Sequence, residues 1–78
     1  MLISAQIRSA RAALGWTAAD LGKAAGIAAR TVLRIEAEPE IPQTTTGTLS
    51  RVQAAFEAAG IEFIGSPNEG PGIRIHQP

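Results

Sequence analysis

The 78-residue sequence contains no cysteine and no tyrosine, and aromatic residues make up only 4% of it. Without cysteine the chain has neither a disulfide staple nor a thiolate zinc site. Its length allows one small domain, near the size at which a single hydrophobic core is barely sufficient. Small size without staples favours oligomerisation, because association buries additional apolar surface.

Long hydrophobic runs are also missing. No apolar run approaches the roughly 18 residues of a membrane-spanning helix, and the apolar start, Met1-Leu2-Ile3, is too short for a signal peptide. We therefore expect a cytoplasmic protein without a membrane partner.

The sequence contains little that would support catalysis or metal binding. Its single histidine, His76, lies near the end of the chain, and no cysteine is available as a second ligand or nucleophile. Gly70-Pro71-Gly72 lacks the lysine and the following helix of a phosphate-binding loop, so a turn explains it better. We expect no enzymatic activity, no cofactor and no metal site.

Net charge is absent as well, but the charges are unevenly distributed. Seven basic and seven acidic residues give a formal charge of zero. Residues 1–34 carry five basic residues and one acidic residue, a net +4, whereas residues 35–78 carry two basic and six acidic residues, a net −4. A neutral chain argues against a nucleic-acid partner, but a basic front half suits a protein that presents one face to phosphate.

The segment 17–36, TAADLGKAAGIAARTVLRIE, contains two short helical patterns separated by Gly26-Ile27. The first pattern places Leu21 and Ala25 on one face. Gly22 lies beside them, at a position where a side chain would hold the two helices apart. This arrangement predicts a helix-turn-helix.

The second helical pattern has an apolar back and a basic front. At about 100° per residue, three apolar residues cluster within roughly 60° of arc: Ala28, Val32 and Ile35. The opposite side carries Arg30, Leu33 and Arg34. A DNA-reading helix requires such a front, since arginine binds guanine in the major groove and an apolar side chain contacts a thymine methyl.

A wider set of residues carries a family resemblance: Thr17-Ala18-Ala19-Asp20-Leu21-Gly22, Ala25-Gly26-Ile27, Thr31-Val32 and Ile35-Glu36. Over about residues 3 to 59, their spacing resembles the phage Cro and repressor type of helix-turn-helix regulators. Ala18 stands where that family usually has Gln, Gly22 where it has Ala, and Ala28 and Ala29 where it has polar residues. The resemblance implies a mainly α, four-helix lambda-repressor-like DNA-binding domain.

The resemblance also implies which residues contact double-stranded DNA. The second helix of the helix-turn-helix, the recognition helix, would contact bases through Ala29, Arg30, Leu33 and Arg34. The residues expected to contact phosphates are Thr17, Ala18, Arg11, Lys23 and Thr31. For Thr17 the helix N-terminus gives a further reason, because its unpaired N–H groups and the helix dipole attract phosphate. A structural ion pair between Arg11 and Glu36 would hold the recognition helix against the first helix.

Periodicity and capping signals predict four helices within a DNA-binding domain of residues 1–60. The first covers Ala5–Leu14, with Ser4 as N-cap and Gly15 as the stop. The second starts after Thr17, which forms a capping box with Asp20. The third starts near Ala28, which is predicted to be a weak N-cap because alanine cannot accept a backbone N–H, and ends around Ala37. The fourth runs from about Thr48 to Ala59, after a loop over Glu38–Gly47. Trp16 precedes the capping Thr17, where an apolar residue commonly packs against the core.

Residues 61–78 predict a C-terminal β-hairpin, where the Cro and repressor type often has a fifth helix. The predicted strands are Ile61–Ile64 and Ile73–His76, joined by an eight-residue loop rich in turn formers. An isolated hairpin is marginal in water, so it packs on the helices or adds its edge to another copy. We expect a homodimer built by apolar side chains without remaining core space: Ile61, Phe63, Ile73 and Ile75.

Two functions remain open at this point. The first is a sequence-specific transcription regulator that binds an operator with inverted half-sites as a dimer. The alternative is a protein-interaction module, such as the antitoxin of a toxin–antitoxin pair or an antiactivator, in which the hairpin and the acidic back half contact a protein partner. A salt titration of DNA binding separates them, because phosphate contacts are lost as salt rises.

Overall fold

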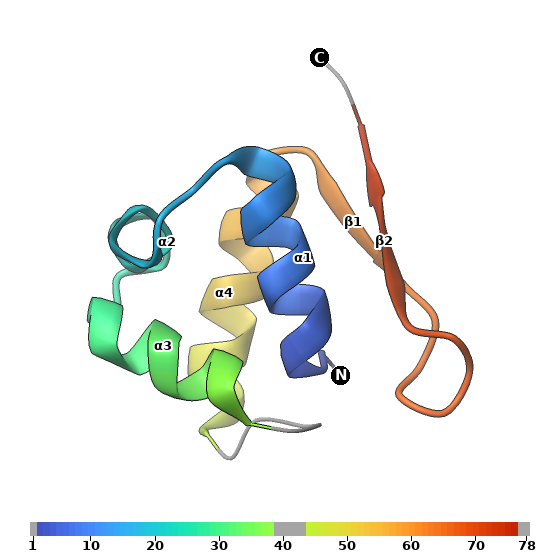
Figure 1. The fold of residues 1–78 in the computed structure, drawn as a ribbon, viewed down its shortest axis with the longest axis horizontal. Helices are drawn as coiled ribbons and strands as arrows, with labels where there is room; N and C mark the ends of the chain where they lie inside the picture. The colour runs from blue at the N-terminus through green and yellow to red at the C-terminus, as the bar shows by residue number, and fades with distance from the viewer. Residues whose placement is uncertain (1, 39–43, 77–78) are drawn as a thin grey trace.

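A computed structural model describes residues 2–38 and 44–76 of the chain. In this part of the chain, four helices precede an antiparallel hairpin: α1 (Ser4–Leu14), α2 (Ala18–Ala25), α3 (Ala29–Ala37), α4 (Thr46–Ala58), β1 (Ile61–Ile64) and β2 (Gly72–Ile75). In Figure 1, α1 lies between the α2–α3 pair on one side and the hairpin on the other. The fold is mainly helical with a C-terminal hairpin, as predicted.

The start of α1 differs from the prediction, because the N-cap is Ile3 and not Ser4. Ser4 is fully buried, and its Oγ donates a hydrogen bond to the carbonyl oxygen of Ile35 at 2.7 Å. Its hydroxyl is therefore committed to another helix. Gln6 takes over the local role, since its Oε1 accepts the N–H of Ile3 at 3.0 Å. The predicted stop is correct, with Gly15 in the left-handed region at φ 67°.

The bounds of α4 also differ from the prediction. The helix begins at Thr46 and ends at Ala58, instead of covering Thr48–Ala59. Thr45 is the N-cap, and its Oγ1 accepts the N–H of Thr48 at 3.1 Å. The run of threonines resembles a loop in composition, but one of its hydroxyls caps the helix. The middle of the predicted loop, residues 39–43, lies outside the described residues.

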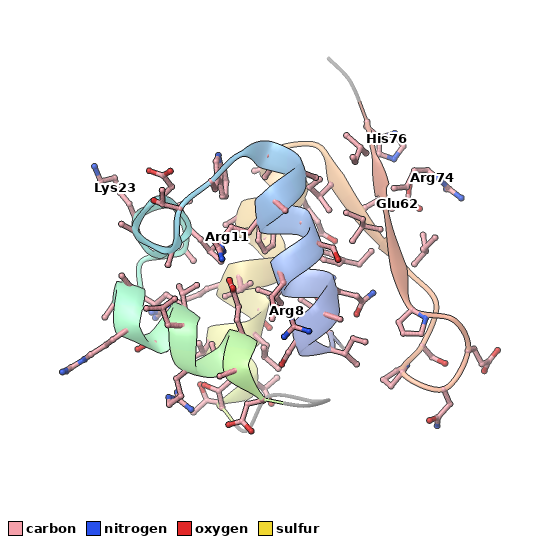
Figure 2. The ribbon with its side chains drawn as sticks, viewed as in Figure 1. Arg8, Arg11, Lys23, Glu62, Arg74 and His76 are labelled. Atoms are coloured by element: carbon pink, nitrogen blue, oxygen red, sulfur yellow. The ribbon has the colours of Figure 1, made fainter. Side chains whose placement is uncertain are left out.

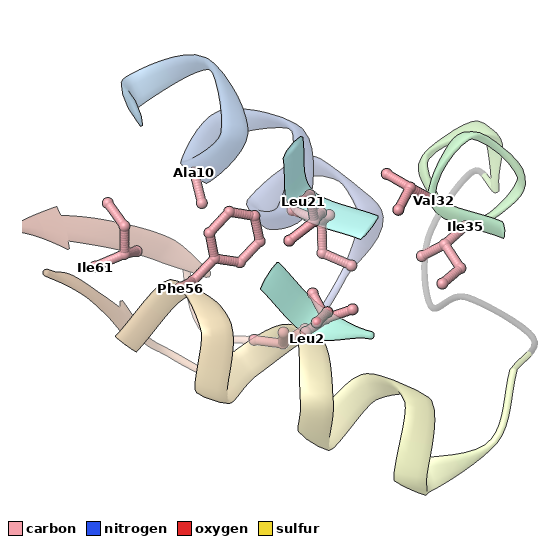
Figure 3. Close-up of a cluster of buried hydrophobic side chains, with 10 residues drawn as sticks. Leu2, Ala10, Leu21, Val32, Ile35, Phe56 and Ile61 are labelled. Atoms are coloured by element: carbon pink, nitrogen blue, oxygen red, sulfur yellow. The ribbon is translucent and has the colours of Figure 1, made fainter. Parts of the chain in front are cut away.

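The hydrophobic core fills the space between the helices and the hairpin (Figure 3). Its buried apolar members are Leu2, Ile7, Ala10, Leu21, Ala25, Val32, Ile35, Val52, Phe56 and Ile61. The fully buried Phe56 ring stacks on Trp16 at a centroid distance of 5.7 Å and meets Phe63 edge-on at 5.8 Å. Each such aromatic pair contributes about 0.5–1.5 kcal/mol beyond its buried area. Trp16 thus packs against the core, as predicted.

The hairpin register pairs Ile61 with Ile75 and Ile64 with Gly72. β2 therefore begins and ends one residue earlier than the predicted Ile73–His76, and seven residues connect the strands. The loop shortens because Gly72, placed among the turn formers by composition, pairs with the last residue of β1.

Hydrogen bonds to the rest of the chain fix the hairpin at both ends. Next to α4, the carbonyl oxygen of Gly60 accepts the N–H of His76 at 2.7 Å. Near the connecting loop, the Nε2 of Gln6 donates to the carbonyl oxygens of Ile64 at 3.3 Å and Gly72 at 2.9 Å. The hairpin therefore packs on the helices of its own chain.

The expectation that four hairpin residues lack core space is wrong for Ile61. Its side chain is 2% exposed and belongs to the core, because it follows directly on the helix that carries Phe56. Phe63 and Ile73 are half-buried and pack against the same core. Ile75 alone of the four is half exposed, at 50%. Within residues 2–38 and 44–76, none of the helices has the length and hydropathy of a membrane-spanning segment.

Candidate nucleic-acid interface

The N-terminus of α2 is built by reciprocal capping. Thr17 Oγ1 accepts the N–H of Asp20 at 3.1 Å, and Asp20 Oδ2 accepts the N–H of Thr17 at 2.8 Å. Hydrogen bonds from the Thr17 backbone and then from its side chain lower the pKa of Asp20, because they favour the carboxylate. Both residues are exposed. The predicted capping box is present, at a helix end whose first N–H groups have no partner within the helix.

A tight turn joins α2 to α3. Gly26 ends α2 in the left-handed region at φ 72°, and the N–H of Ile27 donates to the carbonyl oxygen of Gly22 at 2.9 Å. A Cβ on Gly22 would lie 2.6 Å from the carbonyl oxygen of Ile27, far inside van der Waals contact. Glycine thus permits the close approach inferred from the sequence, although the crowded atom belongs to the backbone of the turn.

The two sides of α3 separate as the periodicity predicts. Val32 and Ile35 are each 1% exposed and face the core. Arg30, Leu33 and Arg34 are exposed, and the Leu33 side chain is 56% accessible. A large apolar side chain and two basic ones therefore share the outer side of this helix.

Ala28 does not lie on the buried side, contrary to the prediction. It is the exposed N-cap of α3, and its methyl group provides no hydrogen bond to the first turn. The helix begins at Ala29, and Ala28 is the weak N-cap that the sequence predicts. Ala29 and Thr31 are half-buried in the first turn.

Three α1 residues bind the C-terminal end of α3. Ser4, Arg8 and Arg11 have the i, i+4, i+7 spacing that places side chains in one stripe along a helix. Ser4 Oγ donates to the carbonyl oxygen of Ile35, and Arg8 Nη1 donates to that of Glu36. Arg11 donates to the Glu36 carboxylate. α3 is thus held through two of its backbone carbonyl groups and through the carboxylate of Glu36.

The ion pair between Arg11 and Glu36 is bidentate. Arg11 Nε lies 2.8 Å from Oε2, and Nη2 lies 2.9 Å from Oε1. A third donor, Nη1, reaches the carbonyl oxygen of Trp16 at 3.0 Å. The Glu36 side chain is 6% exposed and that of Arg11 27%. The hydrogen bond to Glu36 raises the pKa of Arg11 above its ordinary value, so the guanidinium stays charged.

The candidate DNA-contacting residues and the candidate dimerisation residues lie in different parts of the structure. Lys23 is exposed on α2 and points away from the body of the helices, whereas Arg11 is turned inward (Figure 2). Ala18 is half-buried and packs against the core. The candidate DNA-contacting residues thus lie on α2, α3 and the adjoining side of α1. The candidate dimerisation residues lie in the hairpin, beyond α1.

The outer side of the hairpin carries a second charged cluster (Figure 2). Glu62 accepts from Arg74 Nη1 at 3.3 Å and meets His76 Nε2 at 2.6 Å. The hydrogen bond with His76 is the main reason why the pKa of Glu62 is lowered. Across residues 2–38 and 44–76, no three His, Cys, Asp or Glu side chains gather in a way that would hold a metal ion.

Sequence reasoning did not identify Ser4, Arg8 and Gln6 as contact residues. The spacing of Ser4 and Arg8 relative to Arg11 was a usable signal, because it places them in one helical stripe. Gln6 offered no local signal, since its two hairpin partners are 58 and 66 residues away in sequence.

The four-helix part of the fold matches a known family. The chain matches the helix-turn-helix family model over residues 7–58. It belongs to this family, in its Cro and repressor type. The family is a DNA-binding regulatory one, which indicates a DNA-binding transcription regulator. A comparison with curated proteins and one with solved structures gave no match.

Proposed function

We propose that the protein is a sequence-specific transcription regulator that binds an operator as a homodimer. In each copy, α3 enters a major groove of an inverted half-site. The observation that carries the proposal is the outer side of α3, where Arg30 and Arg34 flank the exposed Leu33. The opposite side of the same helix is buried, so this outer side is the one available to DNA.

Base readout follows from the residue types on that outer side. Arg30 and Arg34 lie one turn apart, and each has the planar donor pair that matches the acceptors of guanine. Leu33 between them suits the methyl group of thymine. Ala29 lies at the groove-entering end of the helix, where its small side chain allows close approach to the DNA.

Phosphate binding surrounds the base-reading residues. Thr17 and the N–H of Ala18 are located at the N-terminus of α2, where the helix dipole favours an anion. Lys23, on the same helix, and Thr31, in the first turn of α3, would contact phosphates beside the groove. Arg11, with 27% of its side chain exposed, would contact another while it remains paired with Glu36.

The hairpin supplies the dimer interface in this proposal. The described sheet has two strands, so each has one edge without a neighbouring strand. An open edge invites another chain. Ile75 exposes half of its apolar side chain on β2, on the same face of the sheet as Phe63 and Ile73. Ile61 contributes by anchoring β1 in the core. A two-fold dimer would place two recognition helices about 34–36 Å apart.

Regulation in this proposal is a matter of occupancy, because bound protein blocks or assists the polymerase at the operator. Selection of bound sequences from a random duplex pool tests it directly, and we expect a site with two-fold symmetry. Binding to that site should fall linearly in a log–log plot against salt concentration. Salt-independent or undetectable binding would instead favour a module whose hairpin contacts a protein partner.

A charge placed on the hairpin edge tests the dimer. We expect Ile75→Lys to halve the mass measured by light scattering and to weaken binding to the two-fold site, because it puts a charge in the apolar contact. Ala54→Lys adds the same charge at an exposed position on α4 and should change neither. Truncation after Gly60 is a poorer test, since it removes Ile61 from the core. A dimer that survives Ile75→Lys would locate the interface elsewhere.

A further inference from the structure

The first two turns of α1 contact two elements on opposite sides. Ser4 and Gln6 are two residues apart, which corresponds to about 200° around a helix. Ser4 binds a carbonyl oxygen of α3, and Gln6 binds carbonyl oxygens of the hairpin. α1 therefore connects the element that would read DNA with the element that would form the dimer.

Gln6 makes this connection through a buried amide. The residue is 3% exposed, and its Nε2 donates to both Ile64 and Gly72, the two residues of the last pair before the hairpin loop. Its Oε1 accepts the N–H of Ile3, so both donors and the oxygen are engaged. If the hairpin moved away from this amide, the amide would lose its hydrogen bonds, and because it is buried, water would not replace them. The loop end of the hairpin is consequently held at one position relative to α1.

The contacts on the other side of α1 complete the link. Ser4 and Arg8 donate to two consecutive carbonyl oxygens at the end of α3, those of Ile35 and Glu36. A hydrogen-bonded helix transmits position with little distortion over its eleven residues. Polar contacts on both sides of α1 thus add to the core packing that holds the hairpin relative to α3.

We propose that Gln6 is a positioning residue that sets the separation of the two recognition helices in the dimer, and through it the half-site spacing that the protein prefers. This inference rests on the proposed hairpin dimer. Gln6 itself is buried, so its effect on the spacing would be indirect, through the two hairpin carbonyl oxygens that it binds.

Binding to operators of varied spacing tests the proposal. The probes are one duplex with a single half-site and a series whose half-site centres are about 8 to 13 base pairs apart, around the turn of about 10–10.5 base pairs expected for such dimers. We expect Gln6→Met, of similar length but without the amide donors and the oxygen that accepts the Ile3 N–H, to leave single half-site affinity within about twofold. Affinity at the best spacing should fall by about tenfold if the hairpin orientation that fits both half-sites is populated about one tenth as often, and the spacing preference should flatten. Gln53→Met is the matched control, because the amide of Gln53 only contacts Glu57 on the surface, and it should retain the wild-type spacing profile.

A distance measurement gives a second readout that does not involve DNA. Because the chain has no cysteine, Ala24→Cys on the exposed side of α2 accepts a single spin label per copy. We expect a narrow inter-label distance distribution for the wild-type background and the Gln53→Met control, and a broader or shifted one for Gln6→Met. Gln6→Asn, which keeps the amide but shortens its reach, should behave like Gln6→Met.

Several results would overturn the inference. An unchanged spacing profile in Gln6→Met would do so, as would an equal loss at single and paired half-sites, or loss of the helical signal in both Gln6 variants. Each of these leaves the dimer intact as a proposal. A wild-type protein without an inter-label distance or a spacing preference would instead remove the proposed dimer, and this inference with it.

Discussion

Arg11 donates two hydrogen bonds to the carboxylate of Glu36, at 2.8 and 2.9 Å, and a third to the carbonyl oxygen of Trp16 at 3.0 Å. One guanidinium therefore joins α1 to the end of α3 and to the segment that leads into α2. It fixes both helices of the helix-turn-helix against the first helix. Because the Glu36 side chain is almost fully buried, loss of Arg11 would leave its carboxylate without a charged partner and would lower the free energy of unfolding.

A double-mutant cycle should reveal strong coupling between these residues. We expect a coupling of about 1–3 kcal/mol from Arg11→Ala, Glu36→Ala and the double variant, because the hydrogen bonds are bidentate and charge-assisted. Arg11→Ala should be the costlier single change, since it leaves a buried carboxylate unpaired. Denaturant unfolding measures all four proteins. The exposed pair of Arg74 and Glu62 is the control, for which a much weaker coupling is expected because both side chains are open to solvent. Additive effects at Arg11 and Glu36 would contradict the prediction.

A methyl group on Gly22 should destabilise the fold. In Gly22→Ala, the new Cβ would lie 2.6 Å from the carbonyl oxygen of Ile27, so the turn must shift, at an expected cost of about 1–3 kcal/mol. Gly47→Ala is the matched control, because that helical glycine has open space around it, and it should stabilise by roughly 0.5–1 kcal/mol. Thermal melts compare the two variants, and a stabilising Gly22→Ala would mean that the turn is looser than described.

A side-chain cap should strengthen the recognition helix. Ala28 has the extended backbone of an N-cap, at φ −72° and ψ 146°, but no hydroxyl or carboxylate to accept an N–H. Ala28→Ser should therefore raise stability by roughly 0.5–2 kcal/mol. The midpoint of thermal unfolding measures this change. Thr45→Ala removes the equivalent cap from α4 and should lower the midpoint.

Alanine variants of the recognition helix should separate base readout from general attraction. Arg30→Ala and Arg34→Ala should each cost about 1–3 kcal/mol at the selected site and relax the preference at one base position. Arg51→Ala, an exposed arginine on α4, should leave affinity and the selected sequence unchanged. Competition binding and repeated selection measure both quantities. Full affinity in both arginine variants would mean that α3 does not bind in the major groove.

The hairpin cluster should show a defined pH response. The pKa of Glu62 is lowered in the fold, chiefly by the hydrogen bond with His76. The cluster therefore stabilises the folded protein at pH values above the ordinary pKa of a glutamate carboxyl group. That contribution is lost as pH falls through the lowered folded pKa. Titration of the Glu62 carboxyl by NMR should show its pKa rising toward the ordinary range in His76→Ala. A smaller rise is expected in Arg74→Ala. An unchanged value in His76→Ala would contradict the assignment.

Local signals determined most of the helix-turn-helix. The spacing of Leu21, Ala25, Val32 and Ile35 defined which sides of α2 and α3 are buried, because helical periodicity is a property of neighbouring residues. Capping by Thr17 and the stop at Gly15 were visible for the same reason. The resemblance to the Cro and repressor type added the contact between Arg11 and Glu36, which no local pattern reveals.

Tertiary structure decided the features that depend on distant partners. Ser4 matches an N-cap locally, but it binds Ile35, and the capping role passes to Gln6. Ile61 matches a surface strand residue locally, but it completes the core beside Phe56. In both cases burial far along the chain outweighs a local preference, since a satisfied buried polar group or an enclosed isoleucine contributes more free energy than a cap or a turn.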